Sequence, residues 1–309
     1  ETNQDNFELI PGSPIAYWAS DKIFKLSKLP PISSKFTAKE GVGTRNDAVF
    51  LKRHWEVDKW KIGKQKKWLL TDKAGAYRKW YLGFEHVMNW ENDGYAIKNY
   101  RNEDGSLRSR PQNLNYLYKK GVSWGKVTSG ISSFRLRDNG YGFNDAAPTL
   151  FPLNEEENLN ILLSYLNSKL LLMLLTSRGE TINTTCGLIE GLPLLGYINI
   201  QTYKPEIDLL VQQNISISKT DWDSFETSWD FEVHPLLDKD KQGQVPNTIE
   251  SAYKNWKEYA NNNFAKLKGN EERLNELFIE IYGLEDELTP EISDKDITIA
   301  KIFDDKKDI

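Results

Sequence analysis

The sequence predicts an α/β (mixed α+β) domain followed by a mostly α-helical C-terminal domain. From Lys35 to Pro152 it consists of short apolar and aromatic runs separated by glycine, asparagine and aspartate, a pattern typical of strands. After Gly191 the apolar residues recur at helical spacing instead. The chain has 309 residues, of which 39% are hydrophobic, enough for about two domains with cores of their own.

The first expected element is a short amphipathic helix. Ser13 provides an N-cap and Pro14 a proline at the first helical position, and Pro30-Pro31 ends the pattern. The helix and the linker that follows it make up residues 1–34. The apolar positions that recur at helical spacing are Ile15, Trp18, Ala19, Ile23 and Leu26.

A hairpin and a core helix are expected next. Between Phe134 and Phe143, Asn139-Gly140 joins two short runs, the composition of a type I′ turn, in which both central residues need a positive φ. Asn154 followed by Glu157 resembles a capping box and predicts a helix to about Thr176. The stripe expected to be buried is Leu159, Leu162, Leu163, Leu166, Leu170 and Met173.

The rest of the chain is predicted to be helical. Thr220 with Asp223 resembles one helix cap and Asn247 with Glu250 another, and a last helix is expected from Glu271 to Gly283. We therefore assign residues 35–204 to one domain and 205–309 to an acidic helical domain. The helix after Asn247 has the apolar stripe Ile249, Tyr253, Trp256, Ala260, Phe264 and Leu267.

Charge is unevenly distributed along the chain. The net charge is -5, but residues 45–137, the basic block, hold 20 Lys and Arg against 9 Asp and Glu, together with six of the ten tryptophans. Residues 138–309 hold 15 basic against 31 acidic side chains. This segregation indicates that one part of the protein contacts a polyanion and the other does not.

Several common site types are absent from the sequence. One cysteine and three histidines cannot form a disulfide framework or a Cys/His zinc site, so no metal is expected. The sequence has no GxGxxG fingerprint, Walker loop, GxSxG elbow or HExxH pair, and no catalytic residue is predicted. The most apolar stretch, Leu159 to Thr176, is interrupted by polar residues, so we expect a cytoplasmic protein with no membrane partner.

The basic block alternates cations with aromatics and planar amides, a mixture that suits double-stranded DNA. Arginine and amide side chains can bond base edges, and lysines neutralise phosphates. The base-reading candidates are Arg108, Arg110, Gln112 and Asn113 on an expected loop, and Arg78, Arg135 and Arg137 on or beside strands. The phosphate candidates are Lys66, Lys67, Lys73, Lys79, Lys119, Lys120 and Lys126.

Two alternatives to DNA recognition remain at this point. The basic block can instead dock an acidic protein partner within a complex, since that contact is electrostatic too. A carbohydrate-binding module would explain the aromatics, but it would not need a segment of net charge +11.

Six segments together carry a resemblance to a known family: Pro11–Trp18, Ala76–Gly94, Arg110–Gly130, Leu162–Leu170, Ile217–Phe231 and Asn275–Leu288. They resemble the C-terminal half of PglX-like proteins, the adenine-specific DNA methyltransferases of BREX (bacteriophage exclusion) systems. The resemblance implies a target-recognition domain, related in plan to those of restriction-modification enzymes, followed by a helical accessory domain. It thus implies DNA and an upstream methyltransferase domain as partners, with other BREX proteins as further ones.

The sequence departs from this family at the catalytic motifs. The family holds the flipped adenine with an Asn-Pro-Pro-aromatic motif and binds S-adenosylmethionine with a glycine-rich motif, and neither occurs here. We therefore expect no cofactor in this chain, S-adenosylmethionine in the parent enzyme, a catalytic domain upstream of Glu1, and no methyl transfer by this chain alone.

Overall fold

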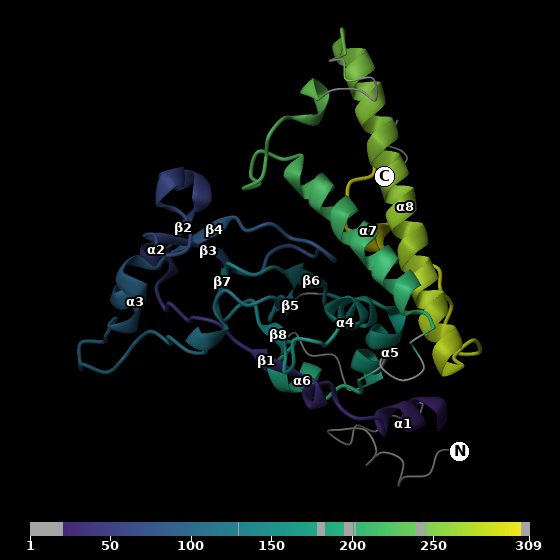
Figure 1. The fold of residues 1–309 in the computed structure, drawn as a ribbon, viewed down its shortest axis with the longest axis horizontal. Coiled ribbons are helices and arrows are strands. Elements are labelled where there is room, and N and C mark those ends of the chain that lie inside the picture. Colours follow the sequence, from purple (N-terminus) through teal and green to yellow (C-terminus); the bar gives the residue numbers. More distant parts are fainter. Residues whose placement is uncertain are drawn as a thin grey trace.

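The computed structural model describes residues 21–128, 130–177, 183–194, 200, 202–238, 243 and 246–303. Its fold is mixed α+β, as the sequence predicted: two four-stranded sheets come first along the chain and long helices follow. Figure 1 shows the sheets side by side, with α7 and α8 along one flank of the molecule.

The first sheet has the strand order β1-β8-β5-β6 and is antiparallel throughout. Its strands are β1 (Phe36–Lys39), β8 (Thr149–Pro152), β5 (Gly121–Trp124) and β6 (Phe134–Arg137). They contribute buried residues to the largest core, where α4 (Leu159–Leu166) contacts β5, β6 and α7 (Lys204–Asp223). The sheet is therefore joined to the C-terminal helices through α4.

The second sheet has the order β2-β4-β3-β7, and its last pair is parallel. It has a small core of its own with α2 (Asp47–Phe50) and α3 (Glu91–Lys98). Short 3₁₀ turns connect many of these elements: Ile32–Ser34, His54–Glu56, Lys59–Lys61, Leu114–Tyr116, Pro235–Leu237 and Asp294–Asp296. The strands are β2 (Leu51–Arg53), β4 (His86–Asn89), β3 (Trp68–Asp72) and β7 (Gly142–Phe143).

The hairpin predicted at Phe134 to Phe143 is wrong. β6 pairs with β5, whereas β7 pairs with β3 in the other sheet. Gly140 has a φ of 92°, but Asn139 is not among the residues with positive φ, so the turn is not type I′. The Gly140 backbone N–H donates to the Tyr118 carbonyl at 2.9 Å, which fixes the connection as a crossover between sheets.

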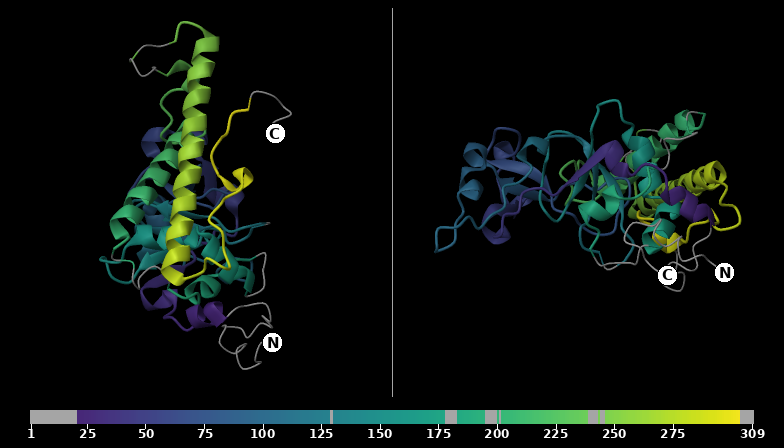
Figure 2. Two further views of the ribbon diagram at one scale, coloured as in Figure 1. Left: turned by 90° about the vertical axis from the view of Figure 1, so that its right-hand side faces the viewer. Right: turned by 90° about the horizontal axis from the view of Figure 1, so that it is seen from below.

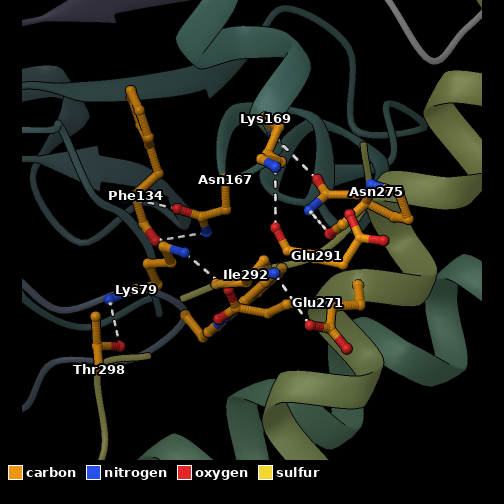
Figure 3. A network of polar contacts seen from close by, with 12 residues as sticks. Lys79, Phe134, Asn167, Lys169, Glu271, Asn275, Glu291, Ile292 and Thr298 are labelled. Carbon is orange, nitrogen blue, oxygen red and sulfur yellow. Dashed lines mark hydrogen bonds and ion pairs between the residues drawn. The ribbon is translucent and has the colours of Figure 1, made fainter. Parts of the chain in front are cut away.

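The predicted core helix is present but divided into α4 and α5 (Lys169–Ser177), bent by 60°. Asn158, and not Asn154, caps α4 by accepting from two backbone N–H groups. At the break, the Asn167 side chain accepts from Phe134 N at 3.0 Å and donates to Phe134 O at 2.9 Å (Figure 3). The break therefore falls at Asn167, whose side chain bonds to strand β6 while its backbone N–H still donates to the Leu163 carbonyl at 3.1 Å.

The C-terminal helices differ from the prediction in their boundaries. Thr220 and Asp223 lie at the end of α7 and do not start a helix. Thr248 caps α8 (Ile249–Tyr282), one residue after the predicted Asn247, through a capping box with Ser251. The two helices predicted after Asn247 are one helix of 34 residues, which ends at Gly283 with a φ of 63°.

Two shorter helices complete the fold. The N-terminal helix is described over α1 (Asp21–Ser27), so its predicted start at Ser13 lies outside the described residues. α6 (Cys186–Glu190) contacts β1. Within the described residues no single helix is long and apolar enough to span a membrane; only the bent pair α4 and α5 passes that test, and only when taken together.

The predicted domain boundary between residues 204 and 205 crosses a shared core. Ile200 and Ile207 on its two sides belong to the same buried cluster, which extends from Ile23 to Ile299. We propose that the division into residues 35–204 and 205–309 is one of charge and function within a single folding unit.

A buried polar anchor joins the basic block to α8. Glu271 of α8 accepts from the Trp80 indole N–H at 2.6 Å and from the Lys79 ammonium at 2.7 Å. All three side chains are buried. Burial lowers the pKa of Lys79, but the adjacent Glu271 carboxylate outweighs this, so the pKa is raised and the lysine stays charged.

Glu271→Gln is expected to destabilise the protein by about 3 kcal/mol or more, because it leaves the Lys79 charge buried and unpaired. Glu276→Gln, which removes a half-exposed carboxylate paired with Arg273, should cost less than about 1 kcal/mol. Urea unfolding of both variants gives these free energies.

Adding Lys79→Met to Glu271→Gln should recover part of the stability, because it removes the unpaired charge. A double variant no more stable than Glu271→Gln would contradict the assignment of the cost to that charge.

Candidate nucleic-acid interface

The basic block presents one long loop, residues 101–120, between α3 and β5. Several backbone contacts hold it, two of which are isolated β-bridges. Near the tip of the loop, Arg101 forms a β-bridge with Leu107. Arg110 forms a second β-bridge with Gly43: the Arg110 N–H donates to the Gly43 carbonyl at 2.7 Å, and the Gly43 N–H donates to the Arg110 carbonyl at 2.9 Å. The loop therefore carries its side chains on a defined backbone.

Arg110 is exposed and is oriented by its neighbour Gln112. The Arg110 guanidinium donates to Gln112 Oε1 at 3.0 Å, and Gln112 Nε2 donates to the Gly41 carbonyl at 3.1 Å. Both ends of the glutamine amide are thus occupied. Gln112 holds the arginine in place, and the guanidinium keeps its other donors for an external acceptor.

Asn113 also anchors the loop. It adopts the left-handed conformation with a φ of 54°, which asparagine tolerates better than most residues. Its Nδ2 donates to the Glu40 carbonyl at 2.8 Å. The predicted base-reading group at residues 108–113 is therefore divided between two exposed arginines and two amides that bond to the backbone of residues 40–41.

Aromatic rings support the remaining cations of this surface. The Arg108 guanidinium lies 5.4 Å from the centre of the Tyr100 ring, whose hydroxyl accepts from Asn46 Nδ2 at 3.0 Å. Lys119 and Lys39 lie 5.0 and 5.9 Å from the Tyr116 ring. Such contacts hold a cation near the surface without neutralising it.

We call six cations on and beside the 101–120 loop the basic strip. Tyr116 connects Lys39 to the 101–120 loop, and Lys64, 5.5 Å from the Tyr118 ring, extends the strip. Within the described residues none of its cations is in an ion pair. Lys66 is exposed two residues after Lys64 and is included with it. The basic strip comprises Lys39, Lys64, Lys66, Arg108, Arg110 and Lys119.

Lys39 and Lys64 were missed as individual candidates. Lys64 falls in a stretch of the basic block rich in lysine and tryptophan, so its composition could have pointed to it. Lys39 lies outside that block, and only the fold brings it to Tyr116.

Three predicted candidates are used inside the protein. Lys79 is paired with Glu271, and Arg135, 2% exposed, donates to Asp72 at 3.2 Å. Arg137, 1% exposed, donates to the carbonyls of Lys119 and Tyr141 and lies against Phe143 and Phe151. These side chains cannot contact DNA from their buried positions.

Arg78 and three lysines are committed to carboxylates at or near the surface. Arg78 donates to Asp221 of α7 at 2.7 Å and lies 5.2 Å from the Trp222 ring. The other pairs are Lys67 with Glu91, Lys73 with Asp47 and Lys126 with Glu40. Lys120 is exposed and lies 3.4 Å from Asp138. These groups are less available to an anion than the basic strip.

No group of three or more His, Cys, Asp or Glu side chains is placed to hold a metal ion in the described part of the chain. Burial, with nearby Glu40 and Glu190, raises the pKa of the Cys186 thiol to about 11, so it is protonated at neutral pH.

Comparison with known proteins identifies relatives along nearly the whole chain, although no family model matches it. The adenine-specific methyltransferase PglX of Lacticaseibacillus casei (strain Zhang) is 36% identical over 312 residues, covering 97% of this chain and 26% of that protein. The adenine-specific methyltransferase BrxX of Escherichia coli O9:H4 (strain HS) is 30% identical over 295 residues, covering 93% and 23%. The predicted resemblance to PglX-like proteins is confirmed. The chain spans about a quarter of the length of these relatives.

Proposed function

Because nearly the whole chain is similar to part of two adenine-specific methyltransferases, we propose that it selects the DNA site for an enzyme of that kind. In this proposal the chain binds double-stranded DNA and reads its sequence. Another part of the polypeptide then transfers a methyl group from S-adenosylmethionine to adenine N6. The modification marks host DNA in a BREX phage-defence system.

The observation that carries the proposal is the arrangement of Arg110 on Gln112. A guanidinium is the side chain best suited to bond the two acceptors of guanine in the major groove, because it offers a rigid fork of donors. Here the fork is exposed, and Gln112 and Gly41 fix its direction before any ligand arrives. Such preorganisation reduces the entropy lost on binding.

The other cations of the basic strip are suited to phosphates. Lys39, Lys66 and Lys119 are point charges, and none of them is in an ion pair with another described residue. Contacts to phosphate fix the register of a protein on the duplex and carry no sequence information themselves. In the proposal these lysines position the loop so that Arg108 and Arg110 meet base edges.

The catalytic step is assigned elsewhere because the chain lacks the motifs for it. Flipping an adenine requires a pocket that stacks on the base and bonds its Watson–Crick edge. The Asn-Pro-Pro-aromatic motif of that pocket and the glycine-rich motif for S-adenosylmethionine are both missing from the sequence.

Replacing Lys119 or Lys66 with alanine should weaken binding to all duplexes about equally. Each loss of a phosphate contact should also lower the slope of log K against log salt by about 1. Lys25→Ala is the matched control, because Lys25 is exposed on α1, away from the basic strip. Fluorescence anisotropy with a labelled duplex, titrated at several salt concentrations, gives the slopes. An unchanged slope in Lys119→Ala would remove that lysine from the interface.

Arg110→Ala should cost about 1 to 3 kcal/mol on the preferred duplex and little on others, so that one base pair is no longer discriminated. Gln112→Ala should act in the same direction but less strongly, because the guanidinium remains and loses only its support. Arg273→Ala on α8 is the control for loss of an arginine.

Competition between preferred and scrambled duplexes measures this discrimination, with the melting temperature recorded for each variant. If Arg110→Ala leaves site preference and melting temperature unchanged, Arg110 does not read the sequence. If scrambled duplex competes as well as any other sequence, the basic strip fits docking of an acidic protein better than sequence recognition.

A further inference from the structure

A groove of about 1070 Å³ opens beside the acidic helices. It lies between the C-terminal end of α7, the segment 229–238 and the N-terminal half of α8. Pockets for small ligands usually measure roughly 300 to 1000 Å³. This groove is therefore large enough for several side chains of a polypeptide.

The N-terminal half of α8 leaves an apolar stripe exposed beside the groove. The sequence predicted an apolar stripe along this helix, and its later members Phe264 and Leu267 are buried. Ile249 is 82% exposed, Tyr253 41% and Tyr259 51%. Figure 2 shows that this half of α8 extends beyond the sheets. An apolar stripe of this size on a helix is typical of a surface that binds a partner.

The groove combines aromatic side chains with an excess of negative charge. Trp229, Phe231, Trp256 and Tyr259 line it. Its lining also includes two lysines against six carboxylates, a formal net charge of -4. One of the two, Lys219, already bridges Asp223 and Asp230 at 2.6 Å each, and the carboxylate of Glu232 is in no ion pair within the described residues.

We propose that this groove docks a basic segment of a partner protein, one that presents lysine or arginine side chains beside a large apolar side chain. The carboxylates attract the cations of the segment, and the tryptophan and tyrosine rings offer faces on which they can stack. The apolar side chain covers the stripe of α8. The same charge excludes DNA from the groove, because phosphates would meet carboxylates. The two faces of the molecule thus bind ligands of opposite charge.

The probe for this proposal is a fluorescein-labelled peptide of twelve residues that alternates lysine and leucine. The full chain should bind it saturably by anisotropy, more weakly as salt is raised, and should not bind a peptide that alternates glutamate and leucine. No saturable binding, or equal binding of both peptides, would overturn the proposal.

Two variants locate the peptide in the groove. Glu232→Lys with Asp238→Lys reverses two exposed charges in its lining and should weaken binding at least about tenfold. Tyr259→Ser removes an exposed ring from the lining and should weaken binding while the melting temperature stays unchanged.

Matched substitutions elsewhere serve as controls. Glu285→Lys changes an exposed charge beyond the C-terminal end of α8, and Leu209→Ser changes an exposed apolar residue of α7 that does not line the groove. Both should leave peptide binding unchanged. A loss of binding in the controls equal to that in the groove variants would show diffuse attraction and overturn the proposal.

Discussion

The buried carboxylate of Glu271 is the constraint on which the arrangement of the molecule depends. It binds Lys79 and Trp80 of the basic block at one point, inside the core shared by the sheets and helices. A charge pair in this environment is costly unless both partners are present and well bonded. The contact therefore permits few relative positions of the basic block and α8.

Bonds within the protein also decide which arginines remain available to a ligand. Arg135 and Arg137 bond Asp72 and backbone carbonyls between the two sheets, and Arg78 bonds Asp221 of α7. These arginines hold the fold together at the points where its parts meet. What remains on the surface is a loop whose amides, Gln112 and Asn113, bond the backbone of residues 40–41 and direct the arginines outward.

The ends of α8 could be predicted from the sequence, and the pairing of the strands could not. The end of α8 at Gly283 and its start within one residue of Asn247 followed from capping, which involves neighbours in sequence. The hairpin at Asn139-Gly140 failed because β6 pairs with the strand before it, β5, whereas β7 pairs with β3, which lies far away in the chain. Thr220 and Asp223 were assigned to a helix start because the same residue types also occur at helix ends.

The candidate interface was predictable as a region but not residue by residue. Arg108 and Arg135 both lie in runs of cations and aromatics, yet one is exposed and the other is 2% exposed. Only the partner Asp72, which lies 63 residues from Arg135 in the chain, distinguishes them. Lys39 joins the basic strip because β1 places it beside Tyr116, a contact that no local pattern indicates.

Selection from a pool of random duplexes tests the central claim most directly. The chain is incubated with the pool at moderate salt, and the retained duplexes are recovered and sequenced. Recognition by the basic strip predicts that one short motif is enriched over successive rounds, and that Arg110→Ala loses the preference at one position of that motif. A retained pool with the same composition as the starting pool, despite salt-dependent binding, would contradict the claim that this chain reads DNA sequence.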